Sequence, residues 1–409
     1  MQLSGHRMIQ NISPRQIFLD NIAQTSPFPL QIEIEKASGI YLYDASGKQY
    51  MDMIAGISVS CLGHCHPAVT KAVATQAEKY MHTLVYGEFV LSPQTNLASL
   101  LASQLPENLQ NIYFLNSGTE ATEGAMKLAK RYTGRREIIS CRNAYHGSTQ
   151  GSASLMSSED YTAPFRPLLP GIGHITFNNF DHLEHITEQT ACVIMEPVQA
   201  EAGIITPEPG YLQAVRERCT QTGTLLIFDE IQTGFGKTGH LFAFLKYGVV
   251  PDVLLLGKAM GGGMPLAAFI SSKEIMSVLM TNPILGHITT FGGHPVNCAA
   301  GCATLETILS EHLTEQVKYK EDLFLQLLQH PLIKEIRHSG LMMAIDLGSN
   351  TAVMKCIQYC LEHGLITDWF LFNDASLRLC PPLIINEEDI RRACKILLDA
   401  FDYYLQVPE

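Results

Sequence analysis

The sequence predicts an α/β fold with a mostly parallel sheet between helices, joined by a smaller α+β domain from both chain ends. Two observations predict the sheet. Short apolar runs such as Leu225–Phe228 and Val253–Leu256 alternate with helix-sized segments from about residue 52 to residue 312. This alternation is typical of buried parallel strands joined by helical crossovers. Several runs also stop at a charged or small polar residue, and ligands of such sheets bind beyond the carboxyl ends of the strands.

Length and composition set the broad class. The chain has 409 residues, 46% hydrophobic and 17% charged, with a formal net charge of −12. That length favours two domains over one. We expect a large domain over 52–312 and a small domain over 313–409, with residues 1–51 packing on the small domain. The acidic balance argues against a sequence-independent nucleic-acid binder.

The cysteines and the N-terminal residues indicate the cellular compartment. The 11 cysteines are odd in number and scattered in apolar surroundings, which favours a reduced, cytoplasmic protein. Residues 1–20 lack the apolar core of a signal peptide, and no apolar run is long enough to span a bilayer. The segment from Cys61 to His66 resembles half of a zinc knuckle, but no second ligand pair follows it. We therefore expect a loop there, a helix from Pro67 to about Met81, and no metal site.

The first strands are expected near the N-terminus. Alternating apolar residues from Ile32 to Leu42, with a turn at 45–47, predict a β-meander. Such a small sheet cannot bury itself, so we expect it to pack on a later segment.

A strand from Asn111 then runs into Ser117-Gly118-Thr119 and a helical pattern. Free backbone N–H groups and the helix dipole make such a helix start a site for an anion such as phosphate. A plain helix cap is the alternative reading of the same three residues.

The next two strands also end in polar residues. Glu137–Cys141 precedes a glycine-rich loop with Tyr145, which could stack on a flat heteroaromatic ring or be a partly buried turn residue. Cys192–Met195 leads to Glu196 and Glu201, which we place on the loop side of the same crevice.

The central pair is Asp229 and Lys258, each at the end of an apolar run. A lysine at a dry strand end can form an imine with an aldehyde, and pyridoxal phosphate also needs an anionic partner for its ring nitrogen. On these two residues alone, a helix-capping aspartate and a solvated lysine remain the alternative.

The remainder of the chain continues in mixed α and β character. A strand is expected at Leu266–Ser271, a helix from Val296 to about Leu309, and a strand pair around Met342–Leu347 and Ser376–Leu379. The last helix runs from Glu387 to about Tyr404, with Asn386 as N-cap.

Several ordered motifs together resemble the class III, fold-type I, pyridoxal-phosphate aminotransferases, in particular those acting on acetylornithine, ornithine and 4-aminobutyrate. The resemblance covers nearly the whole chain and rests on the segments 39–67, 116–132, 144–149, 196–204, 228–244, 257–265, 289–301 and 377–383. It implies a seven-stranded, mostly parallel sheet in the large domain and pyridoxal 5′-phosphate as cofactor.

The resemblance also implies roles for residues. Lys258 carries the cofactor and shuttles the proton, and Asp229 binds the ring nitrogen. The cofactor-binding set it implies is Ser117, Gly118, Thr119, Tyr145, His146, Glu196, Asp229, Gln232, Lys258 and Thr290. Thr290 would reach the cofactor phosphate of the neighbouring subunit, so a homodimer is expected. Glu201 and Arg378 match a gate in which the arginine leaves the glutamate to bind a substrate α-carboxylate.

One position departs from these relatives. Many carry an arginine for a substrate carboxylate where this chain has Ser148, which provides no cationic clamp. Arg142 and Arg166 lie nearby in sequence, and we expect both at the surface. The expected reaction is a ping-pong transfer from an amino acid or ω-amine to 2-oxoglutarate. Pyruvate as acceptor stays open, as does racemisation, decarboxylation or amino-group migration on the same fold; a non-catalytic binding protein is disfavoured.

Overall fold

The structure, a computed structural model, describes residues 13–406. Its centre is a seven-stranded sheet in the order β4-β10-β9-β8-β7-β5-β6. Strands β9, β8, β7, β5 and β6 pair in parallel, and only β10 runs against its neighbours. The sheet predicted from the sequence is therefore confirmed. Its strands are β4 (Asn111–Leu115), β5 (Glu137–Cys141), β6 (Ile172–Ile175), β7 (Thr190–Met195), β8 (Leu225–Asp229), β9 (Val253–Leu256) and β10 (Ala267–Ser271).

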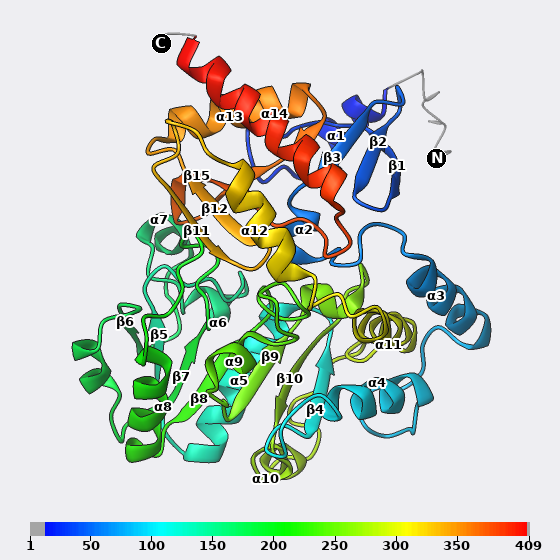
Figure 1. Cartoon of the computed structure of the whole chain (residues 1–409). Coiled ribbons are helices and arrows are strands. Elements are labelled where there is room, and N and C mark those ends of the chain that lie inside the picture. Colours follow the sequence, from blue (N-terminus) through cyan, green and yellow to red (C-terminus); the bar gives the residue numbers. More distant parts are fainter. Residues whose placement is uncertain (1–12, 407–409) are drawn as a thin grey trace, which may run out of the picture.

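The middle strands are buried on both faces. Every residue of β7, β8, β9 and β10 is buried, which explains why these runs are continuously apolar and do not alternate. Helices pack around this sheet in the lower half of Figure 1. The helices before the last domain are α1 (Pro14–Asn21), α2 (Ala55–Ser58), α3 (Pro67–Lys79), α4 (Ser92–Ala102), α5 (Gly118–Thr133), α6 (Gln150–Ala153), α7 (Glu159–Thr162), α8 (Tyr211–Thr222), α9 (Ala243–Tyr247), α10 (Lys273–Met276) and α11 (Pro295–Ser310), with 3₁₀ turns at Ala163–Phe165, Asp181–His185, Lys258–Gly261 and Ser277–Met280.

Two smaller sheets form the upper half. The predicted meander is present and pairs with a strand from the far end of the chain, since β3 runs parallel to β13. This pairing confirms that the N-terminal strands pack on a later segment. The first sheet holds β1 (Ile34–Ser38), β2 (Tyr41–Asp44), β3 (Gln49–Asp52) and β13 (Leu365–Ile366), and the second holds β11 (Glu335–Ser339), β12 (Met342–Asp346), β15 (Asn373–Leu379) and β14 (Asp368–Phe370). The domain boundaries at residues 52 and 313 stay predictions.

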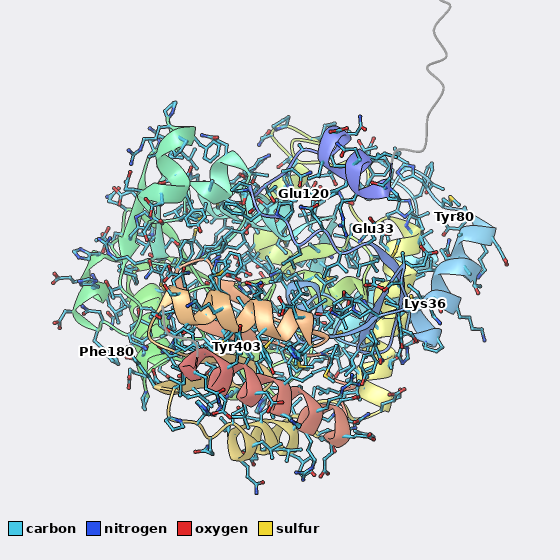
Figure 2. The ribbon with its side chains drawn as sticks, turned by 90° about the horizontal axis from the view of Figure 1, so that it is seen from above. Glu33, Lys36, Tyr80, Glu120, Phe180 and Tyr403 are labelled. Carbon is cyan, nitrogen blue, oxygen red and sulfur yellow. The ribbon has the colours of Figure 1, made fainter. Side chains whose placement is uncertain are left out.

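Three helices cover the second sheet: α12 (Val317–Leu327), α13 (Asn350–Glu362) and α14 (Glu387–Gln406). Seen from above, they lie side by side (Figure 2). The rings of Tyr359 and Tyr403, on α13 and α14, are 5.0 Å apart between centroids. The last helix starts where predicted, because the side chain of Asn386 accepts a 2.9 Å hydrogen bond from the N–H of Asp389.

Candidate active site

A cavity of about 470 Å³ opens at the carboxyl ends of the parallel strands. Five strand ends contribute to its wall: the loops after β4, β5 and β7, the end of β8, and the turn after β9. This is where ligands of such sheets are expected to bind. The cavity is lined by Gly118, Thr119, Tyr145, His146, Gly147, Ser148, Thr149, Glu196, Asp229, Ile231, Gln232 and Lys258.

Lys258 lies two residues after the end of β9, at the start of a 3₁₀ turn. Its φ of +45° is rare for a residue with a side chain, and such strain is characteristic of functional positions. Burial lowers the pKa of its amine below the ordinary value, because the desolvated ammonium is disfavoured. A larger share of the amine is therefore neutral and nucleophilic at neutral pH.

Asp229 is the last residue of β8 and is buried. Its Oδ2 lies 2.7 Å from Nδ1 of His146, and its Oδ1 accepts a hydrogen bond from the N–H of Ile231. Burial disfavours the charged imidazole, but the hydrogen bond and charge of Asp229 outweigh burial and raise the pKa of His146. The protonated histidine would pair with the aspartate and fix its orientation.

The start of α5 has two backbone donors available for a ligand. Ser117 caps the helix, and the carboxylate of Glu120 accepts the N–H groups of Asn116 and Ser117. Among residues 13–406, no acceptor pairs with the N–H groups of Gly118 and Thr119. The plain cap is therefore present, and the anion site stays a prediction that the two unpaired N–H groups favour. The Ser117 side chain serves the cap, while the free N–H groups belong to the next two residues.

The loop after β5 forms the opposite wall. The Tyr145 hydroxyl lies 3.0 Å from the Ser148 hydroxyl, and Thr149 bonds the hydroxyl of Thr119 at 2.6 Å. Gly147 has a φ of +123°, and a Cβ there would come within 2.4 Å of Thr119 Oγ1. Glycine is therefore required where this loop meets the start of α5.

Glu196 adds a buried carboxyl below this loop. It accepts the N–H of Ala200 at 3.1 Å and that of Tyr145 at 3.4 Å. Burial raises its pKa to about 7, and the negative charge of Asp229 contributes to the rise.

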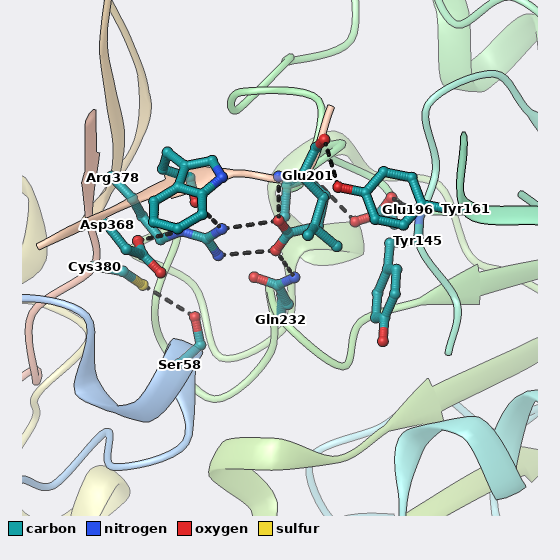
Figure 3. A network of polar contacts seen from close by, with 12 residues as sticks. Ser58, Tyr145, Tyr161, Glu196, Glu201, Gln232, Asp368, Arg378 and Cys380 are labelled. Atoms are coloured by element: carbon teal, nitrogen blue, oxygen red, sulfur yellow. Dashed lines mark hydrogen bonds and ion pairs between the residues drawn. The ribbon is translucent and has the colours of Figure 1, made fainter. Parts of the chain in front are cut away.

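A buried ion pair adjoins the cavity-lining Gln232, as Figure 3 shows. Glu201 and Arg378 form two parallel bonds of 2.8 Å, and both side chains are at most 5% exposed. Glu201 also accepts a 2.9 Å bond from Gln232, which lines the cavity. Burial alone would raise the pKa of Glu201, but Arg378 lowers it to about 2. Glu201 thus connects the cavity-lining Gln232 to the arginine.

Three other predicted residues lie outside the cavity wall. Thr290 is exposed, and its carbonyl accepts a bond from His82. Arg142 and Arg166 are also exposed, and Arg166 pairs with Glu159 at the surface. Neither arginine replaces the missing cation at Ser148 in this chain.

Sequence reasoning missed several neighbours of the site. Ile231 and Thr149 line the cavity, and Asp368 contacts Arg378. The Ser117–Glu120 spacing is a capping-box signal that was available in the sequence. The position of Asp368 had no local signal, because it depends on the pairing of two strands.

The residues present fit pyridoxal phosphate. A half-buried lysine with a lowered pKa suits its aldehyde, and a buried carboxylate suits its ring nitrogen. The free N–H groups of Gly118 and Thr119 suit its phosphate. An α/β sheet with these groups at its strand ends defines a fold-type I pyridoxal-phosphate-dependent enzyme.

Comparison with known proteins specifies the family. Residues 22–401 match the family model described as "Aminotransferase class-III". The chain is 38% identical to the acetylornithine aminotransferase of Methanopyrus kandleri over 380 residues, 92% of this chain and 95% of that protein. It is 39% identical to the putrescine aminotransferase of Pectobacterium atrosepticum, covering 87% and 79%. The chain therefore belongs to the class III aminotransferases, which use pyridoxal phosphate.

Solved structures agree with this assignment. An ornithine aminotransferase structure from Toxoplasma gondii superposes with a TM-score of 0.88 at 30% identity, covering 95% of this chain and 93% of that one. An omega transaminase from Pseudomonas jessenii superposes with a TM-score of 0.88 at 26% identity, covering 97% and 99%. Over residues 13–406, no helix is long and apolar enough to cross a membrane. The same residues include no group of three or more His, Cys, Asp or Glu placed to hold a metal ion.

Proposed function

We propose that this enzyme moves the terminal amino group of an ω-amine donor to 2-oxoglutarate by a ping-pong mechanism, in the cytoplasm. The donor class is that of acetylornithine, ornithine, 4-aminobutyrate and putrescine. The buried Glu201–Arg378 pair next to the cavity carries this proposal.

Lys258 and Asp229 are the proposed catalytic residues. The bound cofactor supplies an aldehyde for the donor amine and a ring that accepts electrons from the donor carbon. Nζ of Lys258 accepts the proton from that carbon and returns it during turnover, for which its lowered pKa is suited. Asp229, held by His146, keeps the ring nitrogen protonated.

The gate lets one pocket take two kinds of substrate. With Glu201 on Arg378, the pocket suits an amine end that has no α-carboxylate. When Glu201 moves away, the guanidinium can bind the α-carboxylate of glutamate or 2-oxoglutarate in bidentate fashion.

Ser148 shapes the donor preference. It is exposed and bonded to Tyr145, and it leaves the outer wall without a cation. We infer that a distal carboxylate on the donor is not required, which favours diamines and simple ω-amines. The same absence would favour pyruvate over 2-oxoglutarate if no other cation binds the γ-carboxylate.

We also infer a homodimer in which Thr290 reaches the partner's cofactor phosphate. Residues 81–90 and residues 280–291 carry many exposed apolar side chains. A 2.9 Å contact between His82 and the Thr290 carbonyl joins the two segments. The exposed apolar side chains are Met81, Leu84, Phe89, Val90, Met280, Ile284, Leu285, Ile288 and Phe291. An exposed apolar surface of this kind marks an interaction site.

Half-reactions test the proposal. The purified enzyme is mixed with putrescine, 4-aminobutyrate, ornithine or acetylornithine, and conversion of its bound cofactor to the amine form is followed by absorbance. The amine form is then mixed with 2-oxoglutarate or pyruvate. Fast conversion by putrescine and return by 2-oxoglutarate support the proposal; a strong preference for pyruvate would reject the proposed acceptor.

A further inference from the structure

Arg378 contacts a second carboxylate that the gate does not explain. Oδ1 of Asp368 lies 2.9 Å from Nε of Arg378, at the side of the guanidinium away from the Nη atoms bound by Glu201 (Figure 3). The two atoms pair by charge without the alignment of a hydrogen bond, and neither has another partner among residues 13–406. Two carboxylates thus share one buried cation.

The two carboxylates are held by different parts of the fold. Asp368 lies on β14 directly opposite Arg378 on β15, so their contact is set by the strand register. The hydroxyl of Thr367 also donates to the Arg378 carbonyl, which fixes the two strands at this point. Glu201 instead lies on the loop after β7. Its carboxylate also accepts bonds from Gln232 and from the N–H of Leu371. The contact of Asp368 with the arginine is thus set by strand pairing, whereas Glu201 reaches the arginine from a separate loop and would be the partner that leaves.

The remaining contacts also orient the guanidinium. The carbonyl of Trp369 accepts from Nη2 at 2.8 Å, and the ring of Phe370 lies 4.5 Å from the guanidinium carbon. Both residues follow Asp368 on β14. Strand β14 thus contacts the guanidinium from one side and leaves its two Nη atoms facing Glu201.

We propose that Asp368 is a positioning residue that keeps Arg378 in place when Glu201 leaves, so that the arginine can bind a substrate α-carboxylate. Without a fixed partner, the guanidinium would follow Glu201 and the pair would stay closed. A buried arginine without partners is strongly destabilising. Asp368 and the Trp369 carbonyl keep the guanidinium partnered during the exchange. This inference rests on the proposed gate and adds a second carboxylate to it.

The inference separates substrates by their carboxylates. Asp368 should affect reactions in which Glu201 must leave, and not those in which the gate stays closed. A merely structural residue would affect both kinds of substrate alike.

The test compares Asp368→Asn with wild-type holoenzyme. We expect KM for 2-oxoglutarate, and Kd for glutarate by calorimetry, to rise about tenfold, as for the loss of one charged contact. The half-reaction with putrescine should stay within about twofold of wild type, because Glu201 still holds Arg378 when the gate stays closed. Asp368→Glu, which keeps the charge, should recover most of the affinity.

Asp346→Asn is the matched control. Asp346 also pairs with an arginine in the same sheet, Arg337 at 3.2 Å, but it does not contact Arg378. It should leave both substrate classes unchanged.

The outcomes separate the two levels of the proposal. If Asp368→Asn slows putrescine and 2-oxoglutarate equally, or neither, the positioning role is wrong. If Glu201→Gln also fails to change 2-oxoglutarate binding, the gate itself is wrong. Should Asp368→Asn not fold, Asp368→Ser, which also removes the charge, takes its place: weaker glutarate binding with unchanged putrescine turnover would support the role, and equal losses would overturn it.

Discussion

Replacing Glu201 by glutamine gives the sharpest test of the gate. The substitution keeps the size of the side chain and removes the charge that competes for Arg378. Glu201 makes two 2.8 Å bonds to the arginine in a buried setting. Bonds to charged groups contribute about 1.5–3 kcal/mol each. Because glutamine keeps one acceptor and Asp368 still faces the arginine, we expect the free energy of unfolding to fall by about 2–3 kcal/mol, less than the loss of an entire buried partner.

The same change should strengthen binding of α-carboxylates. Removing about 2 kcal/mol of competition corresponds to a 10- to 30-fold lower KM for 2-oxoglutarate. Turnover with putrescine should change by about threefold at most, because that amine has no carboxylate for Arg378. Half-reactions followed by absorbance measure KM for 2-oxoglutarate and turnover with putrescine. Chemical denaturation measures the free energy of unfolding.

The control for this experiment is Glu159→Gln. Glu159 pairs with Arg166 at 2.6 Å, but both side chains are more than half exposed, so the pair contributes little. An unchanged or higher KM for 2-oxoglutarate in Glu201→Gln, with the control at wild-type values, would refute the competition between Glu201 and the substrate.

Four further outcomes are expected. Lys258→Ala should abolish turnover while circular dichroism shows a retained fold, and wild-type-like turnover would contradict its assigned role. Asp229→Asn should keep bound cofactor but lower kcat by about 10²-fold or more, as expected when a buried preorganised charge is lost; an unchanged kcat would show that ring protonation depends on another group. The rate at which cofactor-free enzyme takes up pyridoxal phosphate should rise with pH and level off below pH 10.5, since burial lowers the pKa of the Lys258 amine and the neutral amine reacts; a midpoint at or above 10.5 would contradict this. Phe291→Glu, a charge within the exposed apolar segment, should shift the protein toward monomer in sedimentation and lower its activity, whereas an unchanged sedimentation coefficient would place the interface elsewhere.

Local sequence patterns predict much of the architecture. The strands ending at Asp229 and before Lys258 were found from short apolar runs, and the structure places them side by side and in parallel. The final helix and its Asn386 cap were found from periodicity and capping chemistry. These signals lie within a few residues of each other along the chain, so one sequence suffices to detect them.

The contacts around the site were harder to predict from the sequence. The resemblance suggested that Glu201 and Arg378 form a pair, but not that Gln232 joins Glu201 to the cavity. The bond between His146 and Asp229 joins residues 83 positions apart. Asp368 faces Arg378 only because β14 and β15 pair in one register, and shifting a strand by one residue would turn that side chain to the other face.

The sequence by itself determined the alternation of strands and helices, the family, and the residue types at the strand ends. It did so because burial and backbone geometry impose short-range patterns on the chain. Only the tertiary structure decided which charges share a buried space. Pairwise electrostatics depends on distances of a few ångströms between residues far apart in sequence, and the packing of the sheets sets those distances.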